Sequence, residues 1–413
     1  MTPTVPSLDR LLGNERVNAA LAWTAVAGLV VGAGASVVSG DDPLWAVFAL
    51  VAAAVAVGPA VARRSWTTML RWEVLAVVLV AVLVRAFGFY VSPAGYVATA
   101  GLALVVAVQL DAFTAVEMTP RFGVLFVTVA TAAFAGVWSV VEFTADALLG
   151  TAFLTDVNEL MWDLVLATAV GLVAGLCFDL YLRASDHRRT GPPADAAHGD
   201  PGSRGRRTAL GGSTLRYAVR GMQAFLVVAT VYAVVTVQYT LIVNTGVPLA
   251  LAAFPTLVRW RYDRDLSAGL ALWIATAAAL HALGALGLYE WFGWYDQVTH
   301  TVSASLVAGV GYAVVGALER YSSAIEFPPR FRVLLVLLFV LGIGVAWEIL
   351  EFATGGLAAL VGGEPVLAQY GLRDIALDLV FDGVGGLLVA LWGTRYFDGV
   401  ANGLARRLHL HGE

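Results

Sequence analysis

Two stretches of this sequence decide the fold: residues 117–143 read EMTPRFGVLFVTVATAAFAGVWSVVEF, and residues 326–352 read EFPPRFRVLLVLLFVLGIGVAWEILEF. Each contains an apolar run of about 20 residues, which is long enough to cross the ~30 Å hydrocarbon core of a bilayer as a helix. The runs are continuously apolar and do not alternate, so they favour helices over the strands of a membrane barrel. Both stretches therefore predict membrane-spanning helices.

The two stretches are also similar to each other. They align without a gap, and ten of the 27 positions are identical. Shared apolarity explains matched Val and Leu, but not the shared Pro-Arg-Phe and Trp-x-x-x-Glu-Phe patterns. Flanking segments match as well: residues 87–90 resemble 292–295, and residues 159–163 resemble 374–378. The sequence thus predicts a tandem duplication in which residues 71–182 and 266–395 share one fold.

Similar apolar runs recur along the whole chain, in which 59% of the residues are hydrophobic and 13% are charged. Soluble domains average about 25% charged residues, so this composition predicts an integral membrane protein. We expect an all-α, polytopic fold of about 12 transmembrane helices in two parallel six-helix repeats. The expected spans lie near residues 18–39, 44–62, 71–90, 94–116, 122–145, 160–182, 215–237, 240–258, 266–288, 297–318, 331–354 and 374–395.

A polar segment rich in Gly, Pro and Arg separates the two sets of spans. This segment, residues 184–213, predicts a disordered cytoplasmic linker between a first repeat, residues 1–183, and a second, residues 214–413. Arginines gather in every second connection, and acidic residues occupy the connections between them. The positive-inside rule then places the linker and both termini in the cytoplasm, with the chain in the plasma membrane.

The expected partners follow from the same features. The lipid bilayer is the main one, and the duplication makes the chain a pseudo-dimer within one polypeptide, with further oligomerisation left open. The formal net charge is −5 and no basic domain is present, so nothing in the sequence supports nucleic-acid binding.

The second repeat carries ionisable residues inside its expected spans, where each costs about 2.5–3.5 kcal/mol and is a functional candidate by default. Helical spacing groups them on three faces, and the predicted topology brings all three to the outer side of the membrane. The members are Asp296 and His300, then Glu348 and Glu351, then Asp374, Asp378 and Asp382, with Arg373 beside them.

The first repeat lacks part of this set. It has Gly95, Ser139 and Ala167 where the second has His300, Glu348 and Asp382. We therefore expect one degenerate and one complete polar site. Because Glu142 in the first repeat matches Glu351, we expect a structural role for Glu351 and chemistry at Glu348.

Six carboxylates and one imidazole cannot all be charged and close together without compensation, and three interpretations follow. A proton-active or substrate site would use His300, Glu348, Glu351 and Asp378 as catalytic groups and Asp296, Asp374, Asp382 and Arg373 to bind substrate. A divalent metal ion such as zinc, manganese, magnesium or calcium would take His300, Glu351 and Asp378 as ligands. In a structural role, the acids would cap helix N-termini and hydrogen-bond to neighbours.

Two further sets of residues have plainer interpretations. His281 stands alone in the middle of its span and is typical of a helix–helix contact. Gly383, Gly385 and Gly386 are expected to allow close packing of the last helix.

The polar motifs resemble the YjdF-like family of bacterial inner-membrane proteins. That pattern is Tyr-Asp-x-x-x-His, then Glu-x-x-Glu, then spaced aspartates; here it is carried by Tyr295, Asp296 and His300, by Glu348 and Glu351, and by Asp374 and Asp378. The stretch from Asp378 to Gly385 is distantly similar to the VanZ-like motif Asp-x-x-x-Asn-x-x-Gly, with Asp382 at the Asn position. The resemblance implies an inner-membrane protein. YjdF-like proteins have no established activity, and VanZ-like proteins are linked to glycopeptide-antibiotic tolerance.

Three functions remain open from the sequence. The first is a membrane-embedded enzyme that acts on lipid or envelope substrates through an outward-facing His/Asp/Glu site. The second is a proton- or cation-coupled transporter whose two halves enclose a pathway. The third is a non-catalytic membrane scaffold. The loss of polar groups from the first repeat favours a single site over a symmetric pathway.

Overall fold

The structure is a computed structural model that describes residues 14–40, 43–113, 119–186, 212–262, 266–321, 329–363, 365–367 and 369–392. All regular secondary structure in these ranges is helical. The chain divides into two compact units, Met1–Pro192 and Pro193–Glu413. Most of the predicted linker, residues 187–211, and the C-terminal residues 393–413 lie outside the described residues.

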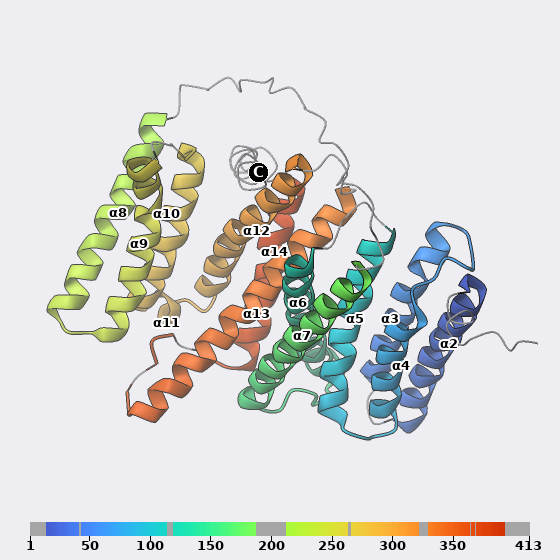
Figure 1. The fold of residues 1–413 in the computed structure, drawn as a ribbon. Coiled ribbons are helices and arrows are strands. Elements are labelled where there is room, and N and C mark those ends of the chain that lie inside the picture. The colour runs from blue at the N-terminus through green and yellow to red at the C-terminus, as the bar shows by residue number, and fades with distance from the viewer. Residues whose placement is uncertain are drawn as a thin grey trace, which may run out of the picture. The chain divides into compact units, whose positions relative to one another are not determined.

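The described residues of unit 1 form six helices, arranged as two groups of three (Figure 1). Helices α2, α3 and α4 contact one another, as do α5, α6 and α7, and α4 and α5 join the groups. The helices are α2 (Glu15–Ser39), α3 (Pro43–Ala62), α4 (Trp72–Ala86), α5 (Val91–Phe113), α6 (Pro120–Leu149) and α7 (Val157–Asp186).

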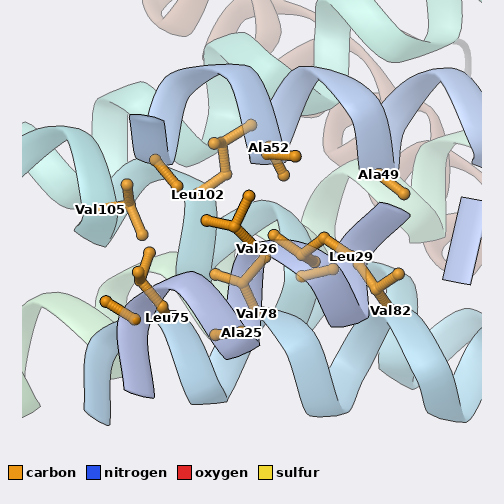
Figure 2. Close-up of a cluster of buried hydrophobic side chains, with 14 of the residues drawn as sticks. Ala25, Val26, Leu29, Ala49, Ala52, Leu75, Val78, Val82, Leu102 and Val105 are labelled. Atoms are coloured by element: carbon orange, nitrogen blue, oxygen red, sulfur yellow. The ribbon is translucent and has the colours of Figure 1, made fainter. Parts of the chain in front are cut away.

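Small residues line the core of the first group. Figure 2 shows Val26 and Leu29 of α2 among side chains of α3, α4 and α5. Alanines such as Ala22, Ala49 and Ala52 are almost completely buried there. Because an alanine adds little beyond the backbone, the helices can approach closely, as membrane helices do.

Unit 2 has a corresponding order of helices. Helix α8 contacts α9 and α10, the helices α12, α13 and α14 contact one another, and α10 contacts α12. A short π-helical segment interrupts the end of α10, with Gly287 at a φ of 128°. The elements are α8 (Gly212–Val235), α9 (Tyr239–Tyr262), α10 (Ala268–Leu283), η1 (Gly284–Leu288), α11 (Tyr289–Trp291), α12 (Tyr295–Tyr321), α13 (Pro329–Val361) and α14 (Leu372–Trp392).

A helix lies at each of the twelve predicted spans when α10, η1 and α11 are taken together. Ten of them, within the described residues, are long and apolar enough to cross a membrane. The other two are α4, which has 15 residues, and α14, which carries three aspartates. The protein is therefore an all-helical, multi-pass membrane protein.

Candidate acid–histidine site

His300 lies at the centre of a group of carboxylates in unit 2. Its Nδ1 atom is 3.1 Å from Oδ1 of Asp382, and its Nε2 atom is 3.7 Å from Oδ1 of Asp378 and 3.8 Å from Oδ1 of Asp296. Asp296 precedes His300 by one turn of α12, while Asp378 and Asp382 are one turn apart on α14. The two sets of residues that helical spacing placed on separate faces therefore meet across one helix pair.

A glycine of α14 makes this approach possible. A Cβ atom at Gly385 would collide with the backbone oxygen of Thr301 and lie 3.0 Å from the backbone nitrogen of Ser305, both on α12. The two backbones thus touch less than one turn beyond Asp382 and His300. Gly386 packs close to Val340 of α13, whereas Gly383 has no neighbour nearer than 3.8 Å. Of the three glycines expected to allow packing, Gly383 is not needed for it.

Asp378 and Asp382 of α14 are more deeply buried than the acid of α12. Their side chains are 2% and 9% exposed, respectively. By contrast, the side chain of Asp296 is 21% exposed and that of His300 is 13% exposed. Asp296 is also the second residue of α12, so the cluster reaches the surface of the unit at the start of that helix.

One oxygen in the cluster has no hydrogen-bond donor. Oδ1 of Asp378 is fully buried and unpartnered, and the nearest cationic group is the His300 imidazole, 3.7 Å away. A buried carboxylate oxygen is normally hydrogen-bonded, because leaving it unpaired costs the full desolvation penalty. Asp378 therefore faces a position that another group is suited to fill.

The two glutamates of α13 complete the cluster in different ways. Glu348 is 1% exposed and accepts a hydrogen bond of 3.2 Å from Nε2 of Gln369. Glu351 accepts one of 3.0 Å from Nε1 of Trp347, one turn before it on the same helix. Both glutamates interact electrostatically with His300, but in the described part of the chain no ion pair joins either of them to the imidazole. They border the cluster of His300 and the aspartates.

The connection between α13 and α14 supplies the edge of the site. Oδ2 of Asp374 accepts a hydrogen bond of 2.9 Å from the backbone nitrogen of Tyr370 and so closes this connection. Burial, together with nearby Glu290 and Asp374, raises the pKa of the Tyr370 hydroxyl, which therefore stays a neutral donor. Arg373 is exposed, and no ion pair joins it to a site residue in the described part of the chain.

Three of these residues are spaced like the ligands of a metal ion. One ligand atom from each of Asp296, His300 and Asp378 lies within 4.8 Å of the others. The ligand set expected from the sequence had Glu351 in place of Asp296. Glu351 instead directs one oxygen to the Trp347 indole, and the ligand group contains the acid that shares a helix face with His300.

Unit 1 contains a polar contact at the residues that align with this cluster in the sequence. Tyr96 donates its hydroxyl hydrogen to Asp163, which aligns with Asp378, and Arg85 interacts electrostatically with the same carboxylate. A Cβ atom at Gly95, which aligns with His300, would lie 2.8 Å from Nη1 of Arg85. The guanidinium thus occupies the space beside the position at which unit 2 has its imidazole.

A second set of polar residues lies on the helices that precede the cluster: Asn244 on α9, His281 on α10 and Tyr289 on α11. His281 makes the helix–helix contact expected of it: its Nε2 atom is 3.0 Å from Oδ1 of Asn244 on α9. Its Nδ1 atom is 3.3 Å from the hydroxyl of Tyr289. A Cβ atom at Gly284 would collide with the Tyr289 ring, so this glycine and the π-helical turn let Tyr289 fold back over α10.

The sequence did not single out Asn244, Tyr289 or Gln369. Asn244 is a polar residue inside an apolar span, and this alone could have marked it as a candidate. Gln369 lies in a connection where nothing in the sequence distinguishes it from its neighbours. Tyr289 depends on the π-helical turn, which no spacing rule predicts.

Comparisons with protein families bear on unit 2 most directly. Residues 218–399 match the model of a family described as "Predicted membrane protein (DUF2238)". This stretch contains most of α8 and all of α9 to α14, and the match supports a YjdF-like membrane family for this part of the chain. Residues 6–69, which contain α2 and α3, match the model of a "Domain of unknown function (DUF8268)". No curated protein and no solved structure matches the chain.

Proposed function

We propose that the protein is a membrane-embedded enzyme whose reaction centre is the acid–histidine cluster of unit 2. One observation carries this proposal: three carboxylates from two helices surround one imidazole within 4 Å, inside helices that are otherwise apolar. Ionisable groups are expensive in such helices and are retained where they act on a substrate or an ion. Asp296 opens the cluster to the surface, so a substrate can reach it.

The proposal gives each residue a role. His300, Glu348 and Asp378 are the buried groups that exchange protons with a substrate or polarise it, and Asp382 orients the imidazole. Glu351 is fixed by Trp347 and is assigned to positioning. Asp296, Asp374 and Arg373 lie at the more exposed edge and are assigned to substrate binding. An amphiphilic lipid or envelope precursor fits a polar centre that opens from within a bundle of membrane helices.

The proposal also includes the duplication of a six-helix unit. In both units the same pairs of helices are in contact in the same order along the chain, except for one small contact between α3 and α5. The aligned Trp and Glu residues make the same bond in both: Trp138 donates to Glu142 at 2.7 Å, and Trp347 donates to Glu351 at 3.0 Å. These features support two copies of one fold, of which the second carries the complete site.

The proposed orientation places the site on the outer face of the plasma membrane, with both termini cytoplasmic. The arginine alternation supports it, and the site lies at the start of α12 and α14, on the side opposite the arginine-rich connections. A lipid headgroup or an envelope precursor on the outer leaflet would then reach the cluster without crossing the membrane.

The enzyme proposal is tested by lipid conversion. The purified full-length protein would be incubated with a total lipid extract from its own source, and the products followed by mass spectrometry. We expect a lipid species to change with the wild type and with Glu142→Gln, but at least 100-fold more slowly with Glu348→Gln. Equal conversion by both variants, or none by the folded wild type, would overturn the proposal.

One observation favours the alternative of a proton-coupled transporter. Asn244, His281 and Tyr289 form a polar chain from α9 through α10, and Tyr289 interacts electrostatically with Asp296. Such a chain is suited to proton transfer through the bundle. Proton uptake into proteoliposomes that depends on His281, without any lipid conversion, would favour the transporter over the enzyme. A scaffold would show neither effect.

A further inference from the structure

We propose that Asp296, His300 and Asp378 bind one divalent cation of the zinc or manganese class, and that Asp382 holds the imidazole in place. This inference rests on the site of the proposed enzyme and assigns that site its cofactor. With the cation bound, Asp296, His300 and Asp378 would serve as its ligands, and proton exchange would be left to Glu348. Asp382 acts through His300 and is a positioning residue.

The imidazole is oriented as in known metal centres. A carboxylate accepts hydrogen bonds and does not donate them, so the 3.1 Å contact with Asp382 places the proton on Nδ1 of His300. When the imidazole is neutral, the lone pair of Nε2 therefore points towards the carboxylates of Asp378 and Asp296. Metal-binding histidines characteristically bond a carboxylate through their second nitrogen, which fixes the ring and its tautomer.

The spacing of the three ligand atoms suits a small cation. Ligand atoms at about 2.0–2.2 Å from a tetrahedral Zn²⁺ ion stand roughly 3.3–3.6 Å apart. Nε2 of His300 lies 3.7 Å from Asp378 and 3.8 Å from Asp296, so shifts of a few tenths of an ångström bring these two pairs to that spacing. All three ligand atoms lie within 4.8 Å of one another. The unpartnered Oδ1 atom of Asp378 would gain its missing partner.

Charge balance supports the same conclusion. In the described part of the chain, every ion pair of Asp296, Asp378 and Asp382 is with His300. If Nε2 is unprotonated, these buried carboxylates have no cation at all, which is strongly destabilising. Unit 1 meets the same need at Asp163 with Arg85. A bound cation would take the place in unit 2 that the guanidinium has in unit 1.

The ligand types select the class of cation. An imidazole nitrogen with carboxylate oxygens suits zinc and manganese, whereas magnesium and calcium prefer oxygen ligands alone. Three protein ligands also leave a fourth position for water or a substrate oxygen, as in catalytic zinc sites. Asp296 is the most exposed of the three ligands, so the open position lies towards the surface of the unit.

The test measures metal binding by the purified full-length protein. After treatment with a chelator, the protein would be equilibrated with ZnCl2, MnCl2 or MgCl2, and bound metal and the melting temperature would be measured. We expect about one Zn²⁺ per chain and a rise in melting temperature that follows the order Zn²⁺, Mn²⁺, Mg²⁺. His187→Ala, His198→Ala, His409→Ala and His411→Ala would be present throughout, to remove the four histidines outside the described residues.

Matched variants separate this site from adventitious binding. His300→Gln and Asp378→Asn should each lower Zn²⁺ affinity at least 100-fold, while Asp382→Asn should lower it about 10- to 100-fold by releasing the imidazole. Asp163→Asn, the counterpart of Asp378→Asn in unit 1, should bind like the wild type. Circular dichroism and gel filtration would establish that each variant is folded.

Two results would overturn the inference: no Zn²⁺ bound by the folded wild type, or binding that His300→Gln leaves unchanged, which is an adventitious ion only. The enzyme proposal fails separately. Lipid conversion that persists in excess chelator would contradict the bound cation and leave the enzyme proposal standing. Stoichiometric Zn²⁺ binding without lipid conversion would contradict the enzyme proposal and leave the cation site standing.

Discussion

At the scale of single residues, Gly385 has the most direct effect on how the site is assembled. Its missing side chain lets α14 touch the backbone of α12 close to His300 and Asp382. The sequence indicated that glycines of this helix serve packing, but spacing alone could not separate Gly385 from Gly383. The difference depends on which face of α14 meets α12, and that is set by the packing of the whole unit.

The contrast between these glycines gives a stability prediction. Gly385→Ala would drive a Cβ atom into the backbone of Thr301 and Ser305, and should destabilise the protein by about 1–3 kcal/mol, as overpacking does. Gly383→Ala has open space and should be neutral or stabilise by up to about 1 kcal/mol. Thermal unfolding in detergent measures both. Equal melting temperatures for the two variants would contradict the observed approach of α12 and α14.

The spaced acidic residues show what a sequence can and cannot predict at this scale. Helical periodicity placed Asp296 and His300 on one face of α12, and Asp378 and Asp382 on one face of α14. These two faces do meet, because all three aspartates lie within 4 Å of the His300 imidazole. The sequence-based hypothesis named Glu351 as a third ligand and our proposal names Asp296, because the position of Glu351 depends on the rotation of α13 and on the Trp347 indole. Local spacing predicts which residues share a face of one helix, and packing between helices determines which of their side chains come into contact.

At the scale of elements, apolar runs located a helix at each of the twelve expected spans. The largest departures are in length. α13 continues to Val361 and α6 to Leu149, beyond the predicted ends at residues 354 and 145. Neither added stretch contains a proline, and α13 runs through Gly355 and Gly356. Hydropathy measures the apolar part of a helix and not its full extent. The π-helical turn η1 was not predicted, since it arises from the close fit of Tyr289 against Gly284.

The orientation of the chain in the membrane can be tested at the connection between α13 and α14. In a Cys177→Ser background, which has no other cysteine, single cysteines at Gly363 and Gln369 should react with an impermeant maleimide added to intact cells. Cysteines placed in residues 187–211 should react only after permeabilisation. The opposite pattern would place the acid–histidine site on the cytoplasmic side and would remove the outer leaflet as its source of substrate.

At the scale of the whole molecule, composition was sufficient to predict a multi-pass helical membrane protein. The inequality of the two units was also visible in the sequence, in the absence of a histidine from the first. The way in which unit 1 compensates was not, because whether Arg85 and Tyr96 reach Asp163 depends on how α4, α5 and α7 pack. That residues 71–182 and 266–395 are two copies of one fold stays a prediction.

The central claim is that one site, built from α12, α13 and α14, carries the chemistry of this protein. An experimental map of the full-length chain in lipid nanodiscs, recorded with and without Zn²⁺, tests it most directly. We predict that the His300 imidazole lies between Asp382 and the carboxylates of Asp378 and Asp296, with a density peak at Nε2 only when Zn²⁺ is present. A map in which His300 points away from all three carboxylates would contradict the account.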